Sequence, residues 1–479
     1  MTEQTEMLSV GIDVGTSTSQ VIFSRLSVAN TSGYFTVPSI SITDKKIIYR
    51  GPVRETPLFD AVMIDADRLA SLVERDYRDA GIRPGDVKTG AVIITGESAR
   101  KENARAVLEK LSAFAGDFVV STAGPDLEAV IAGKGSGAAA FAEQNGAVAA
   151  NLDIGGGTSN AVIFDGEDEI GCGCVDIGGR QVKVGNDGRI TYVSPSAARI
   201  AAAAGLELRT GDRADERTIE ALCRAMCGVL ETFLGLDGDR RLLEEVSTAG
   251  ASRLIVPTRR PIRYLSFSGG VADCIYHPQG DPFAYGDIGP FLGRAVRESR
   301  LFSAFRVIEP EETIRATVIG AGNYTTTVSG STITYARELF PMKNVPVLRL
   351  APEEEQRAWE GDEALVSERL RWFMEQQDAS RSILAIEGRP DPGYRELKTL
   401  AETLVRGMDR VLPQGEALIV IIRCDIAKAL GQIMRQTAAG RRIVAIDAVT
   451  VQRNSYVDFG TPIMDGLVVP VVVKTLIFG

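Results

Sequence analysis

The chain has 479 residues, which at about 100 to 200 residues per domain corresponds to roughly three domains. Hydrophobic residues make up 44% and charged residues 24%, so the chain has enough apolar surface to fold, and disorder throughout is excluded. The formal net charge of -10 argues against a general nucleic-acid binder, because that class carries a basic surface.

The rare residue types exclude further classes of protein. The single histidine, His277, rules out a metal site built from several histidines. The six cysteines form no C-x-x-C pair, and the polar start of the chain is no export signal, so we expect reduced thiols in the cytoplasm. The most apolar run, residues 467–478, is too short for a membrane helix, so we expect a pair of buried strands and no membrane insertion.

The sequence predicts a β-hairpin near the start and repeats it later. An apolar run at 8–14 is followed by the small residues Gly15-Thr-Ser-Thr-Ser19 and a second apolar run. Residues 148–164 follow the same order around Gly155-Gly-Gly-Thr-Ser159. Each first strand ends in an aspartate, Asp13 or Asp153. One domain-sized unit used twice would produce this spacing.

These turns have the chemistry of a phosphate site. Glycine lets the backbone turn tightly, and successive N–H groups of such a turn point into one concavity that suits phosphate oxygens. Proteins usually hold Mg²⁺ through one or two carboxylates plus substrate phosphates. We therefore expect the hairpins to clamp a polyphosphate, with Mg²⁺ between Asp13 and Asp153; the alternative is a pair of ordinary tight hairpins. The residues expected to hold the phosphates are Gly15, Thr16, Ser17, Thr18, Ser19, Gly155, Gly156, Gly157, Thr158 and Ser159.

Between the hairpins, a buried strand is predicted at 91–94 and helices at 98–114 and 126–141. The second helix is interrupted by Gly133, Gly135 and Gly137. These glycines either allow another backbone to approach closely or mark a frayed helix end. Further on, helices are expected near 194–204 and 215–233.

The pattern of residue types along the chain changes near Val345. Pro346, Pro352 and the acidic residues 353–355 predict a linker. Beyond it, strands at 383–386, 418–422 and 443–449 alternate with amphipathic helices, which is typical of a separate α/β module.

Five short motifs, in one order, resemble those of the actin, hexokinase and heat-shock-chaperone ATPase superfamily. Residues 11–19 match its phosphate-1 motif, 153–159 its phosphate-2 motif and 268–271 its adenosine motif. Residues 177–179 resemble the double glycine that follows phosphate-2 in the chaperones, and 318–322 resemble the hinge element.

The resemblance implies an α/β protein with the two-lobed actin-like ATPase fold, which consists of duplicated ribonuclease-H-like domains, and with ATP and Mg²⁺ bound. The first lobe is expected at 8–147, the second at 148–344 and an additional C-terminal α/β domain at 346–479. It also implies that Gly178, Gly179, Gly269 and Gly270 line the ribose and adenine side.

A closer resemblance covers nearly the whole chain. Residues 8–19, 95–103, the second hairpin and 469–476 are similar to the family of ethanolamine ammonia-lyase reactivating factors. This resemblance implies ATP-driven release of damaged cobalamin from a partner, the adenosylcobalamin-dependent ethanolamine ammonia-lyase, so that intact cofactor can rebind. It also implies a place in bacterial ethanolamine breakdown, in the cytoplasm or associated with a microcompartment.

The expected engine is a hinged clamp that ATP closes and hydrolysis opens. Asp13 and Asp153 would position Mg²⁺ and the attacking water. Glu97, which follows the strand at 91–94, is the candidate base that activates this water. The alternative for Glu97 is a capping carboxylate at a helix start.

The remaining reactive side chains are expected to be structural. His277 follows Asp273 with two residues more than the base-off cobalamin motif D-x-H-x-x-G allows, so cobalamin is expected to belong to the partner. Cys223 and Cys227 are expected to be core thiols. For Cys172 and Cys174, the alternative is that they face the same residues of a symmetry mate, which leaves a homodimer possible.

Three other functions fit the same motifs. A small-molecule kinase of this fold would yield a phosphorylated product, whereas a reactivating factor would hydrolyse ATP under stimulation by a lyase. An actin-like filament ATPase would pellet as polymer with ATP. A general chaperone would need a peptide-binding β-sandwich, which the alternating pattern after residue 346 does not predict.

Overall fold

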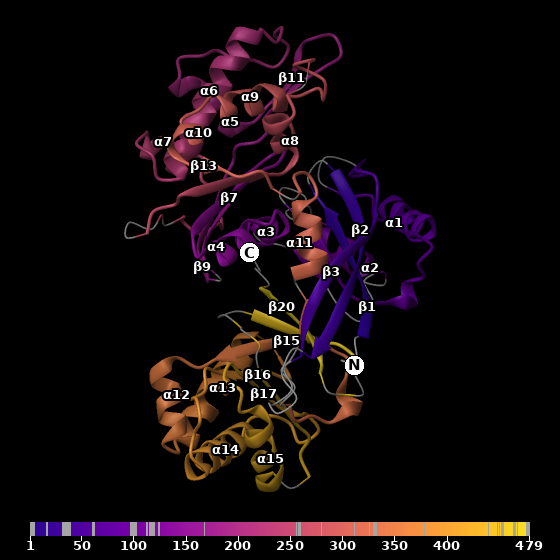
Figure 1. The fold of residues 1–479 in the computed structure, drawn as a ribbon, viewed down its shortest axis with the longest axis vertical. Helices are drawn as coiled ribbons and strands as arrows, with labels where there is room; N and C mark the ends of the chain where they lie inside the picture. Colours follow the sequence, from indigo (N-terminus) through magenta and orange to yellow (C-terminus); the bar gives the residue numbers. More distant parts are fainter. Residues whose placement is uncertain are drawn as a thin grey trace.

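The chain folds into two similar lobes and a C-terminal unit (Figure 1). The computed structural model describes residues 5–475 except 16–17, 31–39, 60–62, 96–102, 112–113, 115–119, 123–124, 167, 255, 257–259, 279, 311, 325, 329–332, 378, 439, 448, 450, 452–454, 463–465 and 467. Among these residues, no helix combines the length and apolar character needed to cross a bilayer.

The first lobe is built on a sheet with the strand order β3-β2-β1-β5-β6. Its strands are β1 (Thr5–Val14), β2 (Thr18–Asn30), β3 (Ile40–Arg50), β5 (Val87–Ile94) and β6 (Val120–Thr122), and the short β4 (Arg54–Glu55) pairs with β2. Helices α1 (Ala66–Ala80) and α2 (Ala104–Leu111) pack on one face of the sheet, and the 3-10 turn η1 (Pro84–Asp86) leads into β5. β1, β2 and β3 are antiparallel neighbours, whereas β5 and β6 run parallel to β1.

The second lobe repeats this plan. Its strands are β7 (Val148–Ile154), β8 (Ser159–Asp165), β9 (Asp168–Val175), β12 (Tyr264–Ser268) and β13 (Arg306–Val307). β7, β8 and β9 are antiparallel neighbours, and β12 and β13 run parallel to β7, so the sheet has the order of the first one. This repeat confirms the predicted two-lobed, duplicated α/β fold.

The other elements of the second lobe surround its sheet. They are the ribbon of β10 (Val182–Val184) and β11 (Ile190–Val193) and the helices α5 (Pro195–Ala203), α6 (Glu216–Phe233), α7 (Arg240–Glu245), α8 (Gly270–Tyr276), α9 (Gly289–Arg297) and α10 (Leu301–Ala304). Cys223 and Cys227 of α6 lie in the core that these helices form with the sheet, which confirms them as core thiols.

Two helices cross between the lobes. The helix that precedes the second lobe in sequence packs on the second sheet, and the helix that follows the second lobe packs back on the first sheet. Helix α3 (Pro125–Gly135), followed by α4 (Ala138–Asn145), packs on the second sheet, where Ala129 contacts the cluster around Phe164. Helix α11 (Ala316–Tyr324) packs on the first sheet, where Val318 lies in one cluster with Ile22. Figure 1 shows α3 and α11 side by side between the lobes.

Glycines allow this crossing. A Cβ added at Gly135 would overlap the carbonyl oxygen of Ala316, and one at Gly320 would overlap that of Ile131. Of the two alternatives for the glycines in the predicted helix 126–141, close approach of another backbone is therefore the one confirmed at Gly135.

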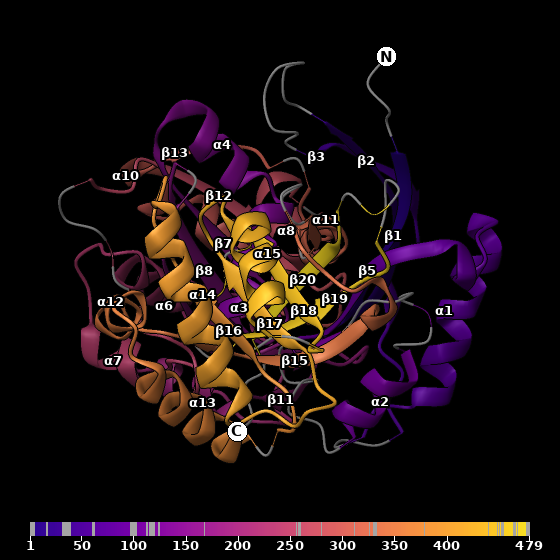
Figure 2. The same cartoon turned by 90° about the horizontal axis from the view of Figure 1, so that it is seen from below.

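The C-terminal unit has a seven-stranded sheet in the order β14-β20-β19-β15-β16-β17-β18. Its strands are β14 (Thr326–Val328), β15 (Met342–Arg349), β16 (Ile383–Ile386), β17 (Leu418–Ile422), β18 (Ile443–Asp447), β19 (Ser455–Phe459) and β20 (Pro470–Thr475). β15 to β18 are parallel neighbours. Helices α12 (Pro352–Trp359), α13 (Glu363–Gln377), α14 (Tyr394–Asp409) and α15 (Ala427–Thr437) pack together on one face (Figure 2).

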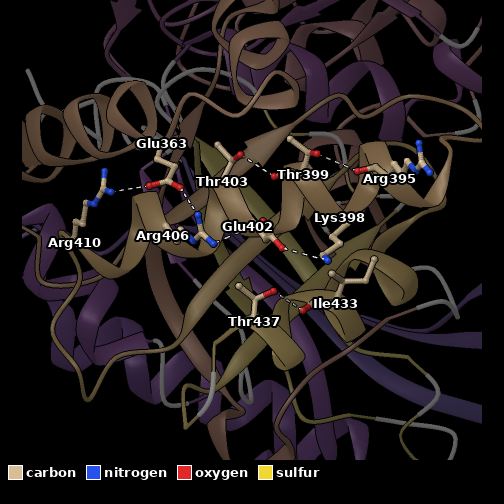
Figure 3. A network of polar contacts seen from close by, with 10 residues as sticks. All are labelled: Glu363, Arg395, Lys398, Thr399, Glu402, Thr403, Arg406, Arg410, Ile433 and Thr437. Atoms are coloured by element: carbon tan, nitrogen blue, oxygen red, sulfur yellow. Dashed lines mark hydrogen bonds and ion pairs between the residues drawn. The ribbon is translucent and has the colours of Figure 1, made fainter.

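A polar network joins helices of this unit (Figure 3). Glu363 of α13 accepts hydrogen bonds from Arg406 at 2.9 Å and Arg410 at 2.6 Å, on α14 and at its end. These side chains lie outside the sheet–helix core, so the network fixes the relative position of two helices that the core already holds.

The linker predicted around Pro346 and Pro352 is wrong. Val345 and Val347 are fully buried in β15, the strand that joins the antiparallel and the parallel parts of the sheet. Pro352 is the first residue of α12, where its missing N–H costs nothing, and Glu354 accepts a hydrogen bond from the backbone N–H of Ala351 as in a capping box. Of the residues that suggested a linker, Pro346 therefore lies within a strand, and Pro352 with the acidic residues 353–355 begins a helix.

The C-terminal unit contacts the first lobe. Val468, which precedes β20, is buried in one cluster with Met7, Leu26 and Val28 of β1 and β2. Strand β14 follows α11 directly and pairs with β20, so the chain passes from a helix of the first lobe straight into the C-terminal sheet. The exact domain limits stay predictions.

Candidate functional site

A cavity of about 1110 Å³, part of it open to solvent, lies between the two lobes. Both hairpin turns line it, although their positions in the sequence are a domain apart. The predicted site residues among its lining are Asp13, Gly15, Thr18, Asp153, Gly155, Gly156, Gly157, Thr158, Gly179, Gly269 and Gly270.

The two turns share an equivalent backbone hydrogen bond. The backbone N–H of Gly15 donates to the carbonyl oxygen of Thr18 at 2.9 Å, and that of Gly155 donates to Thr158 at 2.9 Å. The second turn is braced by the segment after β9, because the N–H of Gly179 donates to Gly155 at 3.0 Å. The repeat recognised in the sequence is thus also a repeat in backbone structure, with both turns at one cavity.

Asp13 is buried at the end of β1. Its Oδ1 accepts a hydrogen bond from the hydroxyl of Thr95 at 3.1 Å. Burial raises the pKa of Asp13 to about 7; the hydrogen bond from Thr95 opposes this shift and the charge of Asp153 adds to it. The two carboxylates are thus close enough to repel each other across the cavity.

Asp153 is held by a chain of hydrogen bonds inside the second lobe. The hydroxyl of Ser268 donates to its Oδ1 at 2.5 Å, and Asn151 donates to the Ser268 oxygen at 2.9 Å. Burial raises the pKa of Asp153 to about 6, against the hydrogen bond from Ser268. The chain of donors fixes the side chain in one orientation.

Each of the two buried aspartates has a buried amide side chain opposite it in its hairpin. Gln20 pairs with Asp13 across the first hairpin, and Asn160 pairs with Asp153 across the second. Both side-chain oxygens, Gln20 Oε1 and Asn160 Oδ1, are buried without a hydrogen-bond partner. Such orphaned acceptors, next to carboxylates whose charge is costly to bury, fit a hydrated divalent cation that supplies both positive charge and water donors.

The end of the cavity beside α8 also carries the acids Asp273 and Asp287. Gly269 and Gly270 stand at the start of α8, and Tyr285, half-exposed, lies on the same wall. Arg180 lines the wall as well and is held by Asp287, with Nε 3.5 Å from Oδ2. A flat apolar group with polar edges fits this end.

Not every predicted site residue lines the cavity. Ser159 is fully buried and donates its hydroxyl to the carbonyl oxygen of Ile177 at 2.8 Å, so it shapes the turn from behind. Gly178 packs against the backbone of Gly156. Thr16, Ser17 and Glu97 lie outside the described residues.

Three carboxylates of the cavity, Glu128, Asp273 and Asp287, were not among the predicted site residues. Glu128 of α3 is buried and lines the cavity together with Asp13 and Asp153. A signal existed, because Glu128 is an acid within the apolar run 127–132 of a helix, where an alanine or leucine would be expected. Only the crossing of α3 between the lobes shows that this helix reaches the cavity.

Comparison with known proteins gives the family. The family model described as ethanolamine utilisation protein EutA matches residues 5–479. The chain belongs to the EutA family. It is 37% identical to the ethanolamine ammonia-lyase reactivase EutA of Salmonella typhimurium and 36% identical to that of Escherichia coli, with 99% of each chain covered. The family predicted from the motifs is thereby confirmed.

A solved structure, the PPX-GPPA enzyme of Aquifex aeolicus, is 15% identical, with a TM-score of 0.34 over 66% of this chain and 90% of that one. The assignment of the fold for this member of the EutA family depends on the two matching sheet orders.

His277 is not one of the residues that line the cavity, although its partner Asp273 is. It is exposed at the end of α8, with Nδ1 3.5 Å from Asp273 Oδ1, which confirms the predicted surface position. Within the described residues of this EutA-family chain, no group of three or more histidines, cysteines or acidic residues is close enough to form a metal site of its own. A cation at Asp13 and Asp153 would therefore need ligands from water or substrate.

Proposed function

We propose that this chain binds Mg²⁺ and ATP between its lobes, hydrolyses the ATP, and uses the resulting movement to reactivate ethanolamine ammonia-lyase. The observation that carries the proposal is the meeting of both glycine-rich turns and both buried aspartates at one cavity. The names of the two relatives, reactivases of ethanolamine ammonia-lyase, support the choice of partner.

In this proposal the two turns hold the phosphates. Gly15 and Thr18 contribute from the first lobe, and Gly155 to Thr158 from the second. Asp13 and Asp153 hold Mg²⁺, with Gln20 and Asn160 accepting from its waters. The cation would neutralise the phosphate charge and allow both aspartates to stay ionised. Thr16 and Ser17, also expected here, stay predictions.

Glu128 is our candidate for the group that takes a proton from the attacking water. A general base must lie within reach of the reacting group, and Glu128 shares the cavity with both metal-binding aspartates. Asp287, another acid of the lining, already accepts from the N–H of Gly289 at 2.8 Å and pairs with Arg180, so it is occupied. Glu97 remains the alternative base from the sequence.

The crossing helices suggest how hydrolysis moves the lobes. Glu128 of α3 and Thr317 of α11 both line the cavity, and the two helices touch at Gly135 and Gly320. A change in the phosphates therefore acts on the contact about which the lobes can turn. We propose that this turning releases damaged cobalamin from the lyase, so that intact adenosylcobalamin can rebind, in the cytoplasm or at a microcompartment.

The test is recovery of lyase activity. Ethanolamine ammonia-lyase blocked with cyanocobalamin is mixed with this protein, ATP, Mg²⁺ and fresh adenosylcobalamin, and deamination is assayed. Activity should return only with ATP and Mg²⁺ together, and the Asp13→Asn and Asp153→Asn variants should not restore it. If both variants restored lyase activity at the normal rate, the proposed role of Asp13 and Asp153 in holding Mg²⁺ and ATP would be wrong. If the protein hydrolysed ATP but restored no lyase activity, the proposed nucleotide site would stand and the proposed partner would be wrong.

A further inference from the structure

A second cavity, of about 1060 Å³, lies in the C-terminal unit, away from the nucleotide cavity. It opens where the parallel strands β15, β16 and β17 end, at Arg349, Ile386 and Ile422. In open α/β sheets, ligands bind in the crevice outside the carboxyl ends of the parallel strands. The proposed ATPase gives this cavity no role.

Three arginines converge on the cavity from three different strand ends. Arg349 is the last residue of β15, Arg389 follows β16, and Arg423 follows β17. Arg349 Nη2 lies 3.2 Å and Arg423 Nη1 2.9 Å from the two oxygens of Glu387. One carboxylate thus holds two guanidinium groups beside each other and is itself 44% exposed. Arg349 also donates to the carbonyl oxygen of Val451 at 3.0 Å.

The third arginine is fixed by an aromatic ring. The Arg389 guanidinium stacks over Trp359 of α12 at 4.7 Å from the ring centroid, and it donates to Gln356. The preceding residue, Gly388, has φ +84, and a Cβ there would lie 2.8 Å from Ile422 Cγ2. The turn that presents Arg389 therefore requires glycine, so the arginine is built into the cavity wall.

The other acid of the cavity is already satisfied. Glu355 is 7% exposed and accepts from the backbone N–H groups of Glu387 and Gly388, each at 2.8 Å, and from Trp359 Nε1 at 3.2 Å. Its charge holds the turn after β16. Glu387 is therefore the acid that pairs with Arg349 and Arg423, whereas Arg389 Nη1 lies 3.5 Å from Glu396 Oε1.

We propose that this cavity, the arginine pocket (Arg349, Arg389 and Arg423), binds the phosphate group of a small metabolite. The planar forks of guanidinium groups match phosphate oxygens in pairs, and arginine does not lose its charge at any physiological pH. The phosphate takes the place of the exposed Glu387 between Arg349 and Arg423.

The pocket carries its own reporter. The chain has two tryptophans, and Trp359 lines the pocket, so a Trp372→Phe chain emits from the pocket alone. Inorganic phosphate is titrated into this chain, with sodium chloride holding ionic strength constant. We expect a saturable change in fluorescence. In Arg423→Gln, whose side chain is 62% exposed and which should fold normally, the midpoint should rise about tenfold or more.

Arg406→Gln is the matched control, because Arg406 is an exposed, ion-paired arginine of the same unit outside the pocket. It should leave the phosphate midpoint unchanged. The proposal is overturned by three results: no saturable change, an equal change with chloride, or an unchanged midpoint in both Arg423→Gln and Arg349→Gln. A malonate response tighter than the phosphate response would overturn the choice of phosphate. Binding to the nucleotide cavity would be unaffected by either pocket variant, so the two sites are distinguished.

Discussion

Asn160 lies directly opposite Asp153 across the β7–β8 hairpin, and its side-chain oxygen is buried without a hydrogen-bond partner. Gln20 has the same place opposite Asp13 in the first lobe. Each lobe therefore pairs a buried carboxylate with a buried amide oxygen; Asp13, Asp153 and Gln20 line the cavity, and Asn160 is buried opposite Asp153. A pseudo-symmetric acceptor set of this kind has little reason to exist without a ligand that donates to it.

Replacing Asn160 by alanine should separate ligand binding from folding. Because Asn160 Oδ1 makes no hydrogen bond in the protein, we expect a stability change within about 1 kcal/mol. The affinity for ATP in the presence of Mg²⁺ should fall about tenfold, as measured by calorimetry.

Asn151→Ala is the contrasting variant for this experiment. Asn151 donates to Ser268 at 2.9 Å and accepts from Ser266 at 2.8 Å, so its loss should lower the stability by about 1–3 kcal/mol. Equal stability loss in both variants, with unchanged nucleotide affinity in Asn160→Ala, would contradict the role given to the orphaned oxygens.

The stability of the metal-free protein should depend on pH in a definite direction. In the folded state the pKa is about 7 for Asp13 and about 6 for Asp153, above the ordinary value of 3.8. Their contribution to stability is therefore present below pH 4 and is lost as the pH rises through 6 to 7. In EDTA, melting temperatures should fall over this range, and less steeply in the Asp13→Asn, Asp153→Asn double variant.

Mg²⁺ should reverse this trend, because it binds the ionised carboxylates and competes with protons. Its stabilising effect in the presence of ATP should grow from pH 6 to pH 8 in the unchanged chain. A pH profile in EDTA that is identical in the double variant would show that other groups cause it.

Glu128→Gln should abolish hydrolysis while leaving nucleotide binding. A positioned general base contributes about 10²–10⁴-fold to the rate, and glutamine keeps the size of the side chain but cannot take the proton. Steady-state ATP turnover should fall by this factor, with the calorimetric affinity for ATP changed less than about threefold. Glu97→Gln is the paired variant, and loss of turnover in Glu97→Gln with normal turnover in Glu128→Gln would restore the sequence-based choice.

The contact between α3 and α11 should not tolerate a single added methyl group. Gly135→Ala would push a Cβ into the Ala316 carbonyl, and Gly320→Ala would push one into that of Ile131, so each should cost about 1–3 kcal/mol of stability. Gly228→Ala is the control, since this glycine of helix α6 has open space around it, and alanine should stabilise the helix by about 1 kcal/mol. Chemical denaturation checks all three, and a neutral Gly135→Ala would contradict the tight crossing.

Much of the nucleotide cavity could be predicted because its chemistry is local in sequence. The strand predicted at 148–154 is β7, and those at 383–386 and 418–422 are β16 and β17, with the same limits. These segments are continuous apolar runs between small or polar residues, so their limits are sharp. Each aspartate and the glycine-rich turn that follows it lie within a few residues of each other, so the pattern could be recognised in the sequence.

What could not be predicted depends on contacts between distant segments. Glu128 became a candidate only because α3 leaves its own lobe, and a sequence of 11 helical residues does not reveal on which sheet it packs. The arginine pocket is assembled from the ends of three strands, and none of its arginines belongs to a motif. The error at Pro346 and Pro352 has a different origin. Proline and acidic residues are common both in linkers and in the first turn of a helix, as at Pro352, and Pro346 lies inside β15, where proline is unusual.

The direct passage from α11 into β14, together with Val468 among the side chains of β1 and β2, has a mechanical consequence. Through these contacts the C-terminal sheet is anchored to the lobe that carries Asp13. In the proposed mechanism, a nucleotide that alters the angle between the lobes would move the arginine pocket together with the first lobe. A small rotation near the triphosphate would then become a larger displacement of the C-terminal unit, which could act on a large partner.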